Sequence, residues 1–318
     1  MADRVLICGG AGFIGSNIAI RFVEAGWRVI VVDGLLPRTH GRRANLDRIL
    51  SHIELIARPL ESVTDLGNVV SGCDVVVDTM GWSRHLLALE DPLYDLRLNL
   101  QSHLQLVRVF RRGQPRLAIY LGSRHQYGNQ ACTELTEDAA LVPADIQGIH
   151  KTAADHHFRL VSQRTGVPVV SLRFGNTFGP NQPTEGDDIG LVGTFIRNLL
   201  LDQTLVVYSG GRRRNCVFVV DLAEVVFRIA TRDLSGYQAF NVGGHDLTIR
   251  ELVEAILAAA GRGSYRLAEM PEEVRSLEVG SARFSDGRLR ALMGDLPRHD
   301  LRTALALTIA WFRASLRR

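Results

Sequence analysis

The sequence has a single lysine in 318 residues, although lysine and arginine together number 37, so 36 of those 37 basic residues are arginines. This lysine, Lys151, stands in the segment DIQGIHKTAAD, which runs from Asp145 to Asp155. Arginine is longer, forked and always charged, so the two residues are not interchangeable at a tightly built site. A chain that uses arginine almost everywhere else therefore raises the question of what requires an ammonium group at position 151.

Several other features are scarce, and each absence excludes a class of protein. The four cysteines lie far apart without a CxxC pair, which argues against a disulfide framework and against a zinc site. No apolar run reaches the roughly 18 residues that a membrane-spanning helix needs. The net charge is only +3, and the densest basic run, residues 212–214, is too short for a nucleic-acid surface. The amino-terminus has no basic leader or cleavage site, so we expect a cytoplasmic protein without a signal peptide.

The first half of the chain alternates apolar, β-branched runs with longer amphipathic segments, beginning with a helix expected from about Phe13 to Ala25. The runs expected to form strands are 4–9, 28–33, 53–57, 74–80, 117–123 and 167–174. Short apolar runs separated by helices are typical of a parallel sheet that is covered on both faces. The sequence therefore predicts an α/β fold, a doubly wound parallel sheet of the Rossmann type. Loops rich in glycine and proline follow, so we expect a domain at 1–175, a smaller α/β lobe at 176–318, and segments near 214–235 that return to the first domain.

The segment GGAGFIG places three glycines, Gly9, Gly12 and Gly15, between the first strand and the first helix. Glycine lets the backbone turn sharply and approach a pyrophosphate closely, and the helix amino-terminus offers free N–H groups to the phosphates. Asp33 ends the second strand, where a carboxylate can accept hydrogen bonds from both ribose hydroxyls and repel a 2′-phosphate. This pattern predicts an NAD site rather than an NADP site. Its expected members in this region are Gly9, Gly12, Phe13, Ile14, Gly15 and Asp33.

With these residues in place, the whole chain resembles the extended short-chain dehydrogenase/reductase family, which includes nucleotide-sugar 4-epimerases, 4,6-dehydratases and decarboxylases. The resemblance rests on separate motifs: GGAGFIG, EDPLYDLRLNL with Asn99, LGSRHQYG with Ser123, Lys151, LRFGNTFGP with Asn176, GGRRRNCVFVVD with Arg214 and Asp221, and FNVGG. It implies a cytoplasmic, NAD-dependent enzyme that acts on a nucleotide sugar or a related small molecule and forms a homodimer. From the composition described above, we expect no nucleic-acid partner, no membrane partner and no metal.

The resemblance implies a catalytic group in which one member has changed. In the family, a tyrosine four residues before the lysine acts as acid or base, and the lysine holds the nicotinamide ribose and lowers the pKa of the tyrosine. Lys151 matches that lysine and Ser123 matches the family's serine or threonine, but Gln147 stands at the tyrosine position. None of the six tyrosines lies between Tyr127 and Tyr208, so no shift of register restores the hydroxyl. A glutamine amide cannot exchange a proton near neutral pH.

Another group must therefore carry the proton if the chain is active. His125 is the first candidate, because an imidazole suits proton transfer near neutrality and the family's dehydratases place acidic residues at positions that correspond to Arg124 and His125. His150 and His85 are further candidates. The substrate itself could also supply an ionisable group. Asn99 completes the expected catalytic set of Ser123, Lys151, Gln147 and His125.

On the substrate side, Arg214 matches the family's arginine that binds the nucleotide diphosphate, a role suited to a bidentate guanidinium. The other residues expected to contact the substrate are Asn176, Arg275, Arg124 and His85. The resulting hypothesis is NAD-dependent epimerisation, dehydration or keto reduction with a non-standard proton relay. Two alternatives stay open: a catalytically silent NAD-binding sensor or structural protein, and a ketoreductase of secondary metabolism that uses the substrate's own proton.

Overall fold

The computed structural model describes residues 3–130, 134–186, 189–208, 211–270 and 283–317. Its centre is a seven-stranded sheet in the order β11-β7-β5-β4-β1-β2-β3, in which all neighbouring strands are parallel. The strands are β1 (Arg4–Cys8), β2 (Arg28–Val32), β3 (Ile53–Ile56), β4 (Val75–Asp78), β5 (Leu117–Leu121), β7 (Val169–Phe174) and β11 (Tyr237–Val242). The predicted doubly wound α/β fold is confirmed, and the six predicted strands are present with ends shifted by at most two residues.

Helices cover both faces of this sheet, because each strand presents apolar side chains on both sides. One face packs against α1 (Phe13–Glu24), α8 (Val219–Ala230) and α11 (Gly287–Met293), with Phe22, Leu222 and Leu289 buried in the shared core. The other face packs against α2 (Leu66–Ser71), α5 (Ser102–Val109) and α6 (Ile146–Thr165). The loop that follows the carboxyl end of a central strand therefore leads to the start of a helix. Ligands bind at this edge of such sheets.

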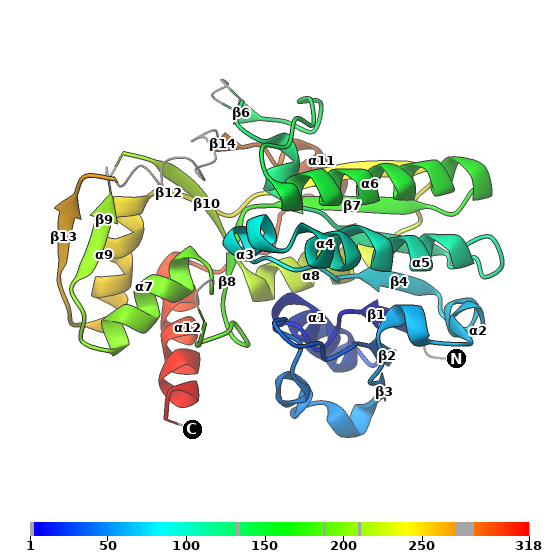
Figure 1. Cartoon of the computed structure of the whole chain (residues 1–318), viewed down its shortest axis with the longest axis horizontal. Coiled ribbons are helices and arrows are strands. Elements are labelled where there is room, and N and C mark those ends of the chain that lie inside the picture. Colours follow the sequence, from blue (N-terminus) through cyan, green and yellow to red (C-terminus); the bar gives the residue numbers. More distant parts are fainter. Residues whose placement is uncertain (1–2, 131–133, 187–188, 209–210, 271–282, 318) are drawn as a thin grey trace.

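A second group of elements stands beside the main sheet and has its own apolar core. A three-stranded sheet has the order β12-β10-β8, and β13 pairs with β9. Figure 1 shows these strands with α7, α9 and α12 at the left of the molecule. The bounds are β8 (Asn176–Phe178), α7 (Leu191–Leu200), β9 (Leu205–Tyr208), β10 (Arg213–Phe218), β12 (His245–Thr248), α9 (Ile249–Ala260), β13 (Tyr265–Ala268) and α12 (Leu301–Ser315).

The chain crosses between the two groups more than once. After β10 it returns through α8 and β11 to the main sheet, leaves again with β12, and returns with α11. A small pair formed by β6 (Glu134–Leu135) and β14 (Arg283–Phe284) lies at the top of the view in Figure 1. The division of the chain into domains at residue 175 stays a prediction. In the described part of the chain, no helix combines the length and the apolar character needed to cross a membrane.

Candidate active site

The turn between β1 and α1 is so tight that it requires glycine at positions 9 and 15. Gly9 has φ +77°, a left-handed conformation that side chains disfavour. A Cβ at Gly15 would stand 2.3 Å from the carbonyl oxygen of Gly9 and 2.6 Å from Oγ1 of Thr79. No side chain caps α1 at Gly12, so the N–H groups of its first turn are available to an anion. The turn has the shape and the donors that a pyrophosphate requires.

Asp33 closes the adjoining strand and faces the same space. Its Oδ2 accepts a hydrogen bond from the N–H of Ala11 at 2.9 Å, and its Oδ1 accepts one from the N–H of Leu35 at 2.8 Å. Burial raises the pKa of this carboxyl, and the two backbone hydrogen bonds partly offset that rise. The carboxylate is thereby fixed beside the glycine turn, where it suits the ribose hydroxyls of a dinucleotide.

These residues open onto one cavity of about 670 Å³. It extends from the glycine turn past the ends of β4 and β5 to β8 and β10. Most residues predicted for the site line it: Gly9, Gly12, Phe13, Ile14, Gly15, Asp33, His85, Ser123, Arg124, His125, Gln147, Lys151, Asn176 and Arg214. Among the described residues, no tyrosine lines this cavity. Arg275 lies outside the described residues.

Lys151 is held deep in the cavity wall by backbone oxygens. Its Nζ donates to the carbonyl oxygens of Met80 at 2.7 Å and Leu121 at 3.1 Å, and the residue is 7% exposed. Burial lowers the pKa of the ammonium from its usual 10.5 to about 8, although the charges of Asp78, Asp95 and Asp155 oppose the shift. The lysine is therefore mostly protonated at neutral pH and is presented at the ends of β4 and β5.

Asn99 supports the cavity from behind and is not among the residues that line it. It lies in a π-helical turn, η4 (Arg97–Gln101), and is fully buried. Its Oδ1 accepts from the N–H of Trp82 at 2.9 Å, and its Nδ2 donates to the carbonyl oxygen of Trp82 at 2.9 Å and to Asp95 at 2.8 Å. The asparagine thus fixes the loop after β4, to which Lys151 is also bonded.

Gln147 lies one turn before Lys151 on α6 and is also buried. Its Nε2 donates to the carbonyl oxygen of Trp82, the same oxygen that accepts from Asn99. The amide therefore helps to hold the loop after β4. Because an amide has no usable pKa, this position contributes a hydrogen bond and no proton transfer.

A polar part of the cavity wall follows β5. Ser123 caps the short 3-10 helix η5 (Arg124–Tyr127), and its Oγ accepts a hydrogen bond from the N–H of His125 at 3.1 Å. Oε1 of Gln126 accepts from the N–H of Ser123 at 2.8 Å and completes a capping box. This geometry brings Ser123, Arg124 and His125 together at the carboxyl end of β5.

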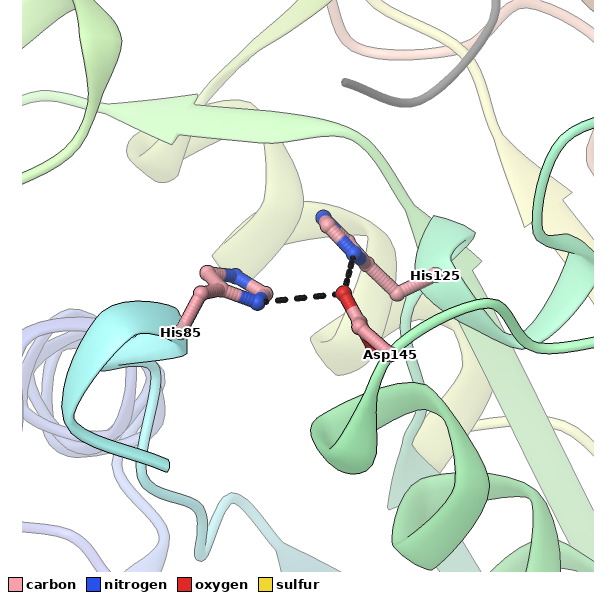
Figure 2. Close-up of side chains that lie close together, drawn as sticks. All are labelled: His85, His125 and Asp145. Carbon is pink, nitrogen blue, oxygen red and sulfur yellow. Dashed lines mark hydrogen bonds and ion pairs between the residues drawn. The ribbon is translucent and has the colours of Figure 1, made fainter. Parts of the chain in front are cut away.

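Two histidines meet at one carboxylate oxygen beside this turn (Figure 2). Nδ1 of His125 lies 2.5 Å from Oδ2 of Asp145, and Nδ1 of His85 lies 3.2 Å from the same oxygen. The two rings stack with centroids 4.3 Å apart and planes 26° apart. The other carboxylate oxygen, Oδ1, accepts from the N–H of Gly148 at 2.6 Å and caps α6.

The ionisation of this cluster follows from its contacts. Burial raises the pKa of Asp145, but the hydrogen bond from His125 and the close contact with the ring of His85 outweigh it and hold the pKa far below its usual range. Burial lowers the pKa of His125; the hydrogen bond to Asp145 opposes this, and the charges of His85 and Arg124 add to it. Asp145 is thus an anion that binds two imidazoles, and His125 is largely neutral at neutral pH.

Sequence reasoning missed Asp145, although a signal was present. An aspartate directly before a helical segment is a preferred amino-terminal cap, and Asp145 precedes α6 by one residue.

Two other predicted residues lie away from this cluster. His150 does not line the cavity, and its Nδ1 lies 2.6 Å from Oδ1 of Asp95. At the far end of the cavity, Arg214 on β10 donates from Nη1 to the carbonyl oxygen of Arg213 at 2.9 Å.

The chain is similar to proteins of known activity over most of its length. A model of the NAD dependent epimerase/dehydratase family matches residues 5–243. The UDP-glucose 4-epimerase of Mycolicibacterium smegmatis is 26% identical over 317 residues, which cover 98% of each chain. The dTDP-glucose 4,6-dehydratase of Xanthomonas campestris is 25% identical over 336 residues, which cover 96% of this chain and 92% of the relative.

Solved structures share the fold of this chain. A UDP-N-acetylglucosamine 4-epimerase from Methanobrevibacter ruminantium matches with a TM-score of 0.89 at 23% identity, and 99% of this chain and 100% of that chain are covered. The UDP-glucose 4-epimerase of Thermus thermophilus, solved in complex with NAD, matches with a TM-score of 0.83 at 25% identity over 98% of this chain and 99% of that chain. The glycine turn and Asp33 fit the same cofactor, so the prediction of NAD is confirmed. The chain belongs to the NAD-dependent epimerase/dehydratase family, whose members are NAD-dependent enzymes.

Proposed function

We propose that this enzyme oxidises a hydroxyl-bearing carbon of a nucleotide sugar, the step with which epimerisation and dehydration begin, and that His125 replaces the missing tyrosine as acid and base. The observation that carries this proposal is the hydrogen bond of 2.5 Å between Nδ1 of His125 and Asp145, next to Ser123 in the cavity wall. A carboxylate bonded to one ring nitrogen orients an imidazole and stabilises its charged form, which is what an acid/base histidine needs.

The roles of the residues follow from their hydrogen bonds. NAD, when bound, supplies the acceptor for a hydride from the sugar carbon. The glycine turn and Asp33 would hold its pyrophosphate and adenosine ribose, and Lys151 would hold its nicotinamide ribose. A carboxylate only accepts hydrogen bonds, so the Nδ1 of His125 that bonds Asp145 carries a proton. The other ring nitrogen, Nε2, then has a free lone pair, and Figure 2 shows it pointing away from Asp145.

That lone pair can take the proton of the substrate hydroxyl, while the Oγ of Ser123 can bond the reacting oxygen. The imidazolium that forms is stabilised by Asp145, and it can return the proton when the carbonyl is reduced again. The hydroxyl of a tyrosine is then not required on α6. The buried amide of Gln147 is consistent with this, because it is already bonded to the loop after β4.

The substrate side of the proposal rests on the cavity and on the relatives. Arg214 and Asn176 line its far end and would bind the diphosphate and the sugar. Arg124 and His85 line it near Ser123, where the reacting sugar would lie. Relatives over nearly the whole chain are named for UDP-sugars and dTDP-sugars, which supports a nucleotide sugar as substrate. We extend the proposal to a homodimer, for which light scattering should give twice the chain mass of 35.1 kDa.

The test is a panel of UDP-sugars and dTDP-sugars incubated with the enzyme and NAD, followed by the absorbance of reduced nicotinamide and by chromatography of the sugars. His125→Asn should lower turnover by a factor of about 10²–10⁴, the usual contribution of an acid/base group. His52→Asn is the matched control, because His52 is exposed and is not among the residues that line the cavity. Turnover unchanged in His125→Asn would remove the histidine from the mechanism. Cofactor binding without turnover of any sugar would favour the silent alternative.

A further inference from the structure

Asp78 ends β4 as a carboxylate that is almost completely buried. It is 1% exposed and does not line the cavity, although the three residues that follow it, Thr79, Met80 and Gly81, all do. Its Oδ1 accepts a hydrogen bond from the N–H of Met80 at 3.1 Å, and its Oδ2 lies 2.7 Å from Nδ1 of His103. Moving a carboxylate out of water is costly unless a cation balances it. A positive charge is therefore required near Asp78.

The imidazole of His103, on α5, does not supply that charge. Burial lowers the pKa of His103; the charge of Asp78 and its hydrogen bond oppose this, and the charge of Lys151 adds to it. A carboxylate only accepts hydrogen bonds, so the proton of the neutral ring is on Nδ1. The other nitrogen, Nε2, is buried and has no hydrogen-bond partner in the described part of the chain. A charged ring would leave a second N–H donor unpaired there, so His103 is a neutral donor that fixes the carboxylate.

Lys151 is the cation that acts on Asp78. Its Nζ donates to the carbonyl oxygen of Met80 at 2.7 Å, and the N–H of Met80 donates to Asp78, so the backbone of one residue bonds both charged groups. Burial lowers the pKa of Lys151 to about 8. Of the three carboxylates that oppose this shift, Asp78 acts most strongly, ahead of Asp95 and Asp155.

The other two carboxylates each bond a basic side chain of their own. Oδ2 of Asp155 accepts a hydrogen bond from Nη2 of Arg173 at 2.9 Å, in an ion pair that is itself buried. Oδ1 of Asp95 lies 2.6 Å from Nδ1 of His150, whose ring is partly exposed to water. By contrast, Asp78 is bonded to a peptide N–H and a neutral imidazole, so its charge is left for the ammonium.

Tyr120 on β5 completes the surroundings of Lys151. Its ring lies 5.2 Å from Nζ of the lysine and packs edge-on against His103, with ring centroids 5.4 Å apart. Burial raises the pKa of the phenol well above its usual value, so Tyr120 stays neutral while the lysine titrates. The ionisable groups that face the ammonium from the surrounding elements are thus Asp78, Asp95, His103, Tyr120 and Asp155.

We propose that Asp78, held in place by His103, is the counterion of Lys151 and a positioning residue for the nicotinamide end of the cofactor. The inference rests on the proposed role of Lys151 at the nicotinamide ribose. Asp78 bonds the N–H of Met80 and so fixes the residue whose carbonyl oxygen holds Nζ. Its charge also keeps the ammonium protonated, so that the lysine can donate to the ribose hydroxyls. Asp78 and His103 do not line the cavity, so both act through Lys151.

The single lysine of the chain makes a direct test possible. Lysine labelled with 13C at Cε gives one resonance in the full-length protein, and its shift is followed from pH 6 to pH 10.5 without cofactor or substrate. In the wild type it should titrate near pH 8. Asp78→Asn keeps the size of the side chain but removes its charge, so the midpoint should fall to about pH 7 or below. Asp74→Asn is the matched control, because Asp74 directly precedes the same strand and is exposed, and its midpoint should stay at the wild-type value.

Two variants of His103 separate the hydrogen bond from the packing. His103→Asn keeps an N–H donor close to the position of Nδ1, whereas His103→Leu keeps an apolar side chain of similar bulk without a donor. A carboxylate that loses its donor binds a proton more readily. His103→Leu should therefore lower the lysine midpoint toward that of Asp78→Asn, and His103→Asn should restore it to near pH 8.

Calorimetry with NAD then tests the link to the cofactor. If only the protonated lysine binds well, affinity between pH 6 and pH 8 should fall about twofold in the wild type and about tenfold in Asp78→Asn. An unchanged lysine midpoint in Asp78→Asn, or an equal fall in Asp74→Asn, would overturn the counterion. A lowered midpoint with the wild-type pH dependence of NAD binding would overturn the positioning role. The lysine titration involves neither substrate nor turnover, so its failure is distinct from a failure of His125→Asn to lose activity.

Discussion

Replacing Lys151 by methionine should change how the stability of the protein depends on pH. The ammonium is 7% exposed, and burial lowers its pKa from 10.5 to about 8. Between these two values the unfolded chain still binds a proton that the folded chain has lost. Stability must therefore rise with pH across this window, because it rises wherever the unfolded state binds more protons. One pKa unit corresponds to about 1.4 kcal/mol, so the window is worth about 3 kcal/mol.

The assay is chemical unfolding by guanidinium, followed by far-UV circular dichroism at several pH values from 7 to 10.5. The quantity to plot is the unfolding free energy of the wild type minus that of Lys151→Met. Other groups that titrate in this range, such as the buried Tyr120, are present in both proteins and cancel. The unfolding free energy of the wild type minus that of Lys151→Met should rise by about 3 kcal/mol from pH 7 to pH 10.5.

The test is how the difference in unfolding free energy between the wild type and Lys151→Met changes with pH, and its value at a single pH is not informative. Methionine removes the buried charge but leaves the carbonyl oxygens of Met80 and Leu121 without their donor, so these opposing effects set the value at pH 7. Lys151→Arg is the matched control, because arginine keeps its charge over the whole range. The Arg and Met variants should differ by a constant amount. A wild-type difference that is equally flat would refute the lowered pKa of Lys151.

Three further predictions test other parts of the site. Gly15→Ala should weaken NAD binding in calorimetry at least about tenfold, because its Cβ would stand 2.3 Å from a backbone oxygen. Gly12→Ala should weaken binding less, because its Cβ would stand 3.2 Å from its nearest neighbour. Equal losses of affinity in the two variants would contradict the tight turn at Gly15. Asp145→Asn should cost stability at pH 7, and this cost should begin to shrink only below about pH 4, because a carboxyl with a lowered pKa stabilises the fold fully above its unfolded value near 4 and loses this effect as pH falls toward its much lower folded value. Urea unfolding at several pH values from 7 to 2 measures the cost, and a cost independent of pH would count against the ionised carboxylate. Gln147→Tyr should restore turnover at least about tenfold in a His125→Ala background, measured by reduced nicotinamide; no recovery would show that α6 cannot present a phenol to the substrate.

The main sheet could be predicted from the sequence because its strands are apolar on both faces. One strand of the main sheet, β11, was not evident from the sequence; it lies at the edge of the sheet and has the sequence YQAFNV. Its first three residues are only partly buried, so polar side chains such as Gln238 are tolerated and the apolar run is lost. An edge strand of this kind is defined by its pairing with β7, which composition alone does not reveal.

The residues of the candidate site also differ in whether the sequence could predict them. Gly9, Gly15 and Asp33 could be placed because a tight strand–helix turn is a local backbone requirement that spacing records. The contact between His85 and Asp145 joins residues 60 positions apart through two loops. Nothing in the local pattern of either segment encodes that meeting. It depends on how the loop after β4 and the start of α6 pack against each other.

The lone lysine and the glutamine beside it are explained by that packing. Nζ of Lys151 bonds Met80, while Gln147 and Asn99 both bond Trp82, so three buried side chains hold the loop after β4. The space is narrow: a Cβ at Gly81 would lie 3.1 Å from Nζ and 3.2 Å from Oδ1 of Asn99. A compact ammonium fits between the backbone oxygens, and the planar fork of arginine does not match that geometry.

The same loop carries His85, because α3 (His85–Glu90) begins three residues after Trp82. Glutamine at position 147 therefore has a second effect besides the loss of the tyrosine hydroxyl. It ties α6 to the loop that brings His85 to Asp145, and Asp145 caps α6 two residues before Gln147. A tyrosine there would carry a proton itself but could not donate an amide hydrogen bond to Trp82. The substitution thus fits the proposed arrangement, in which the start of α6 supplies the carboxylate that orients His125 and the imidazole on η5 transfers the proton.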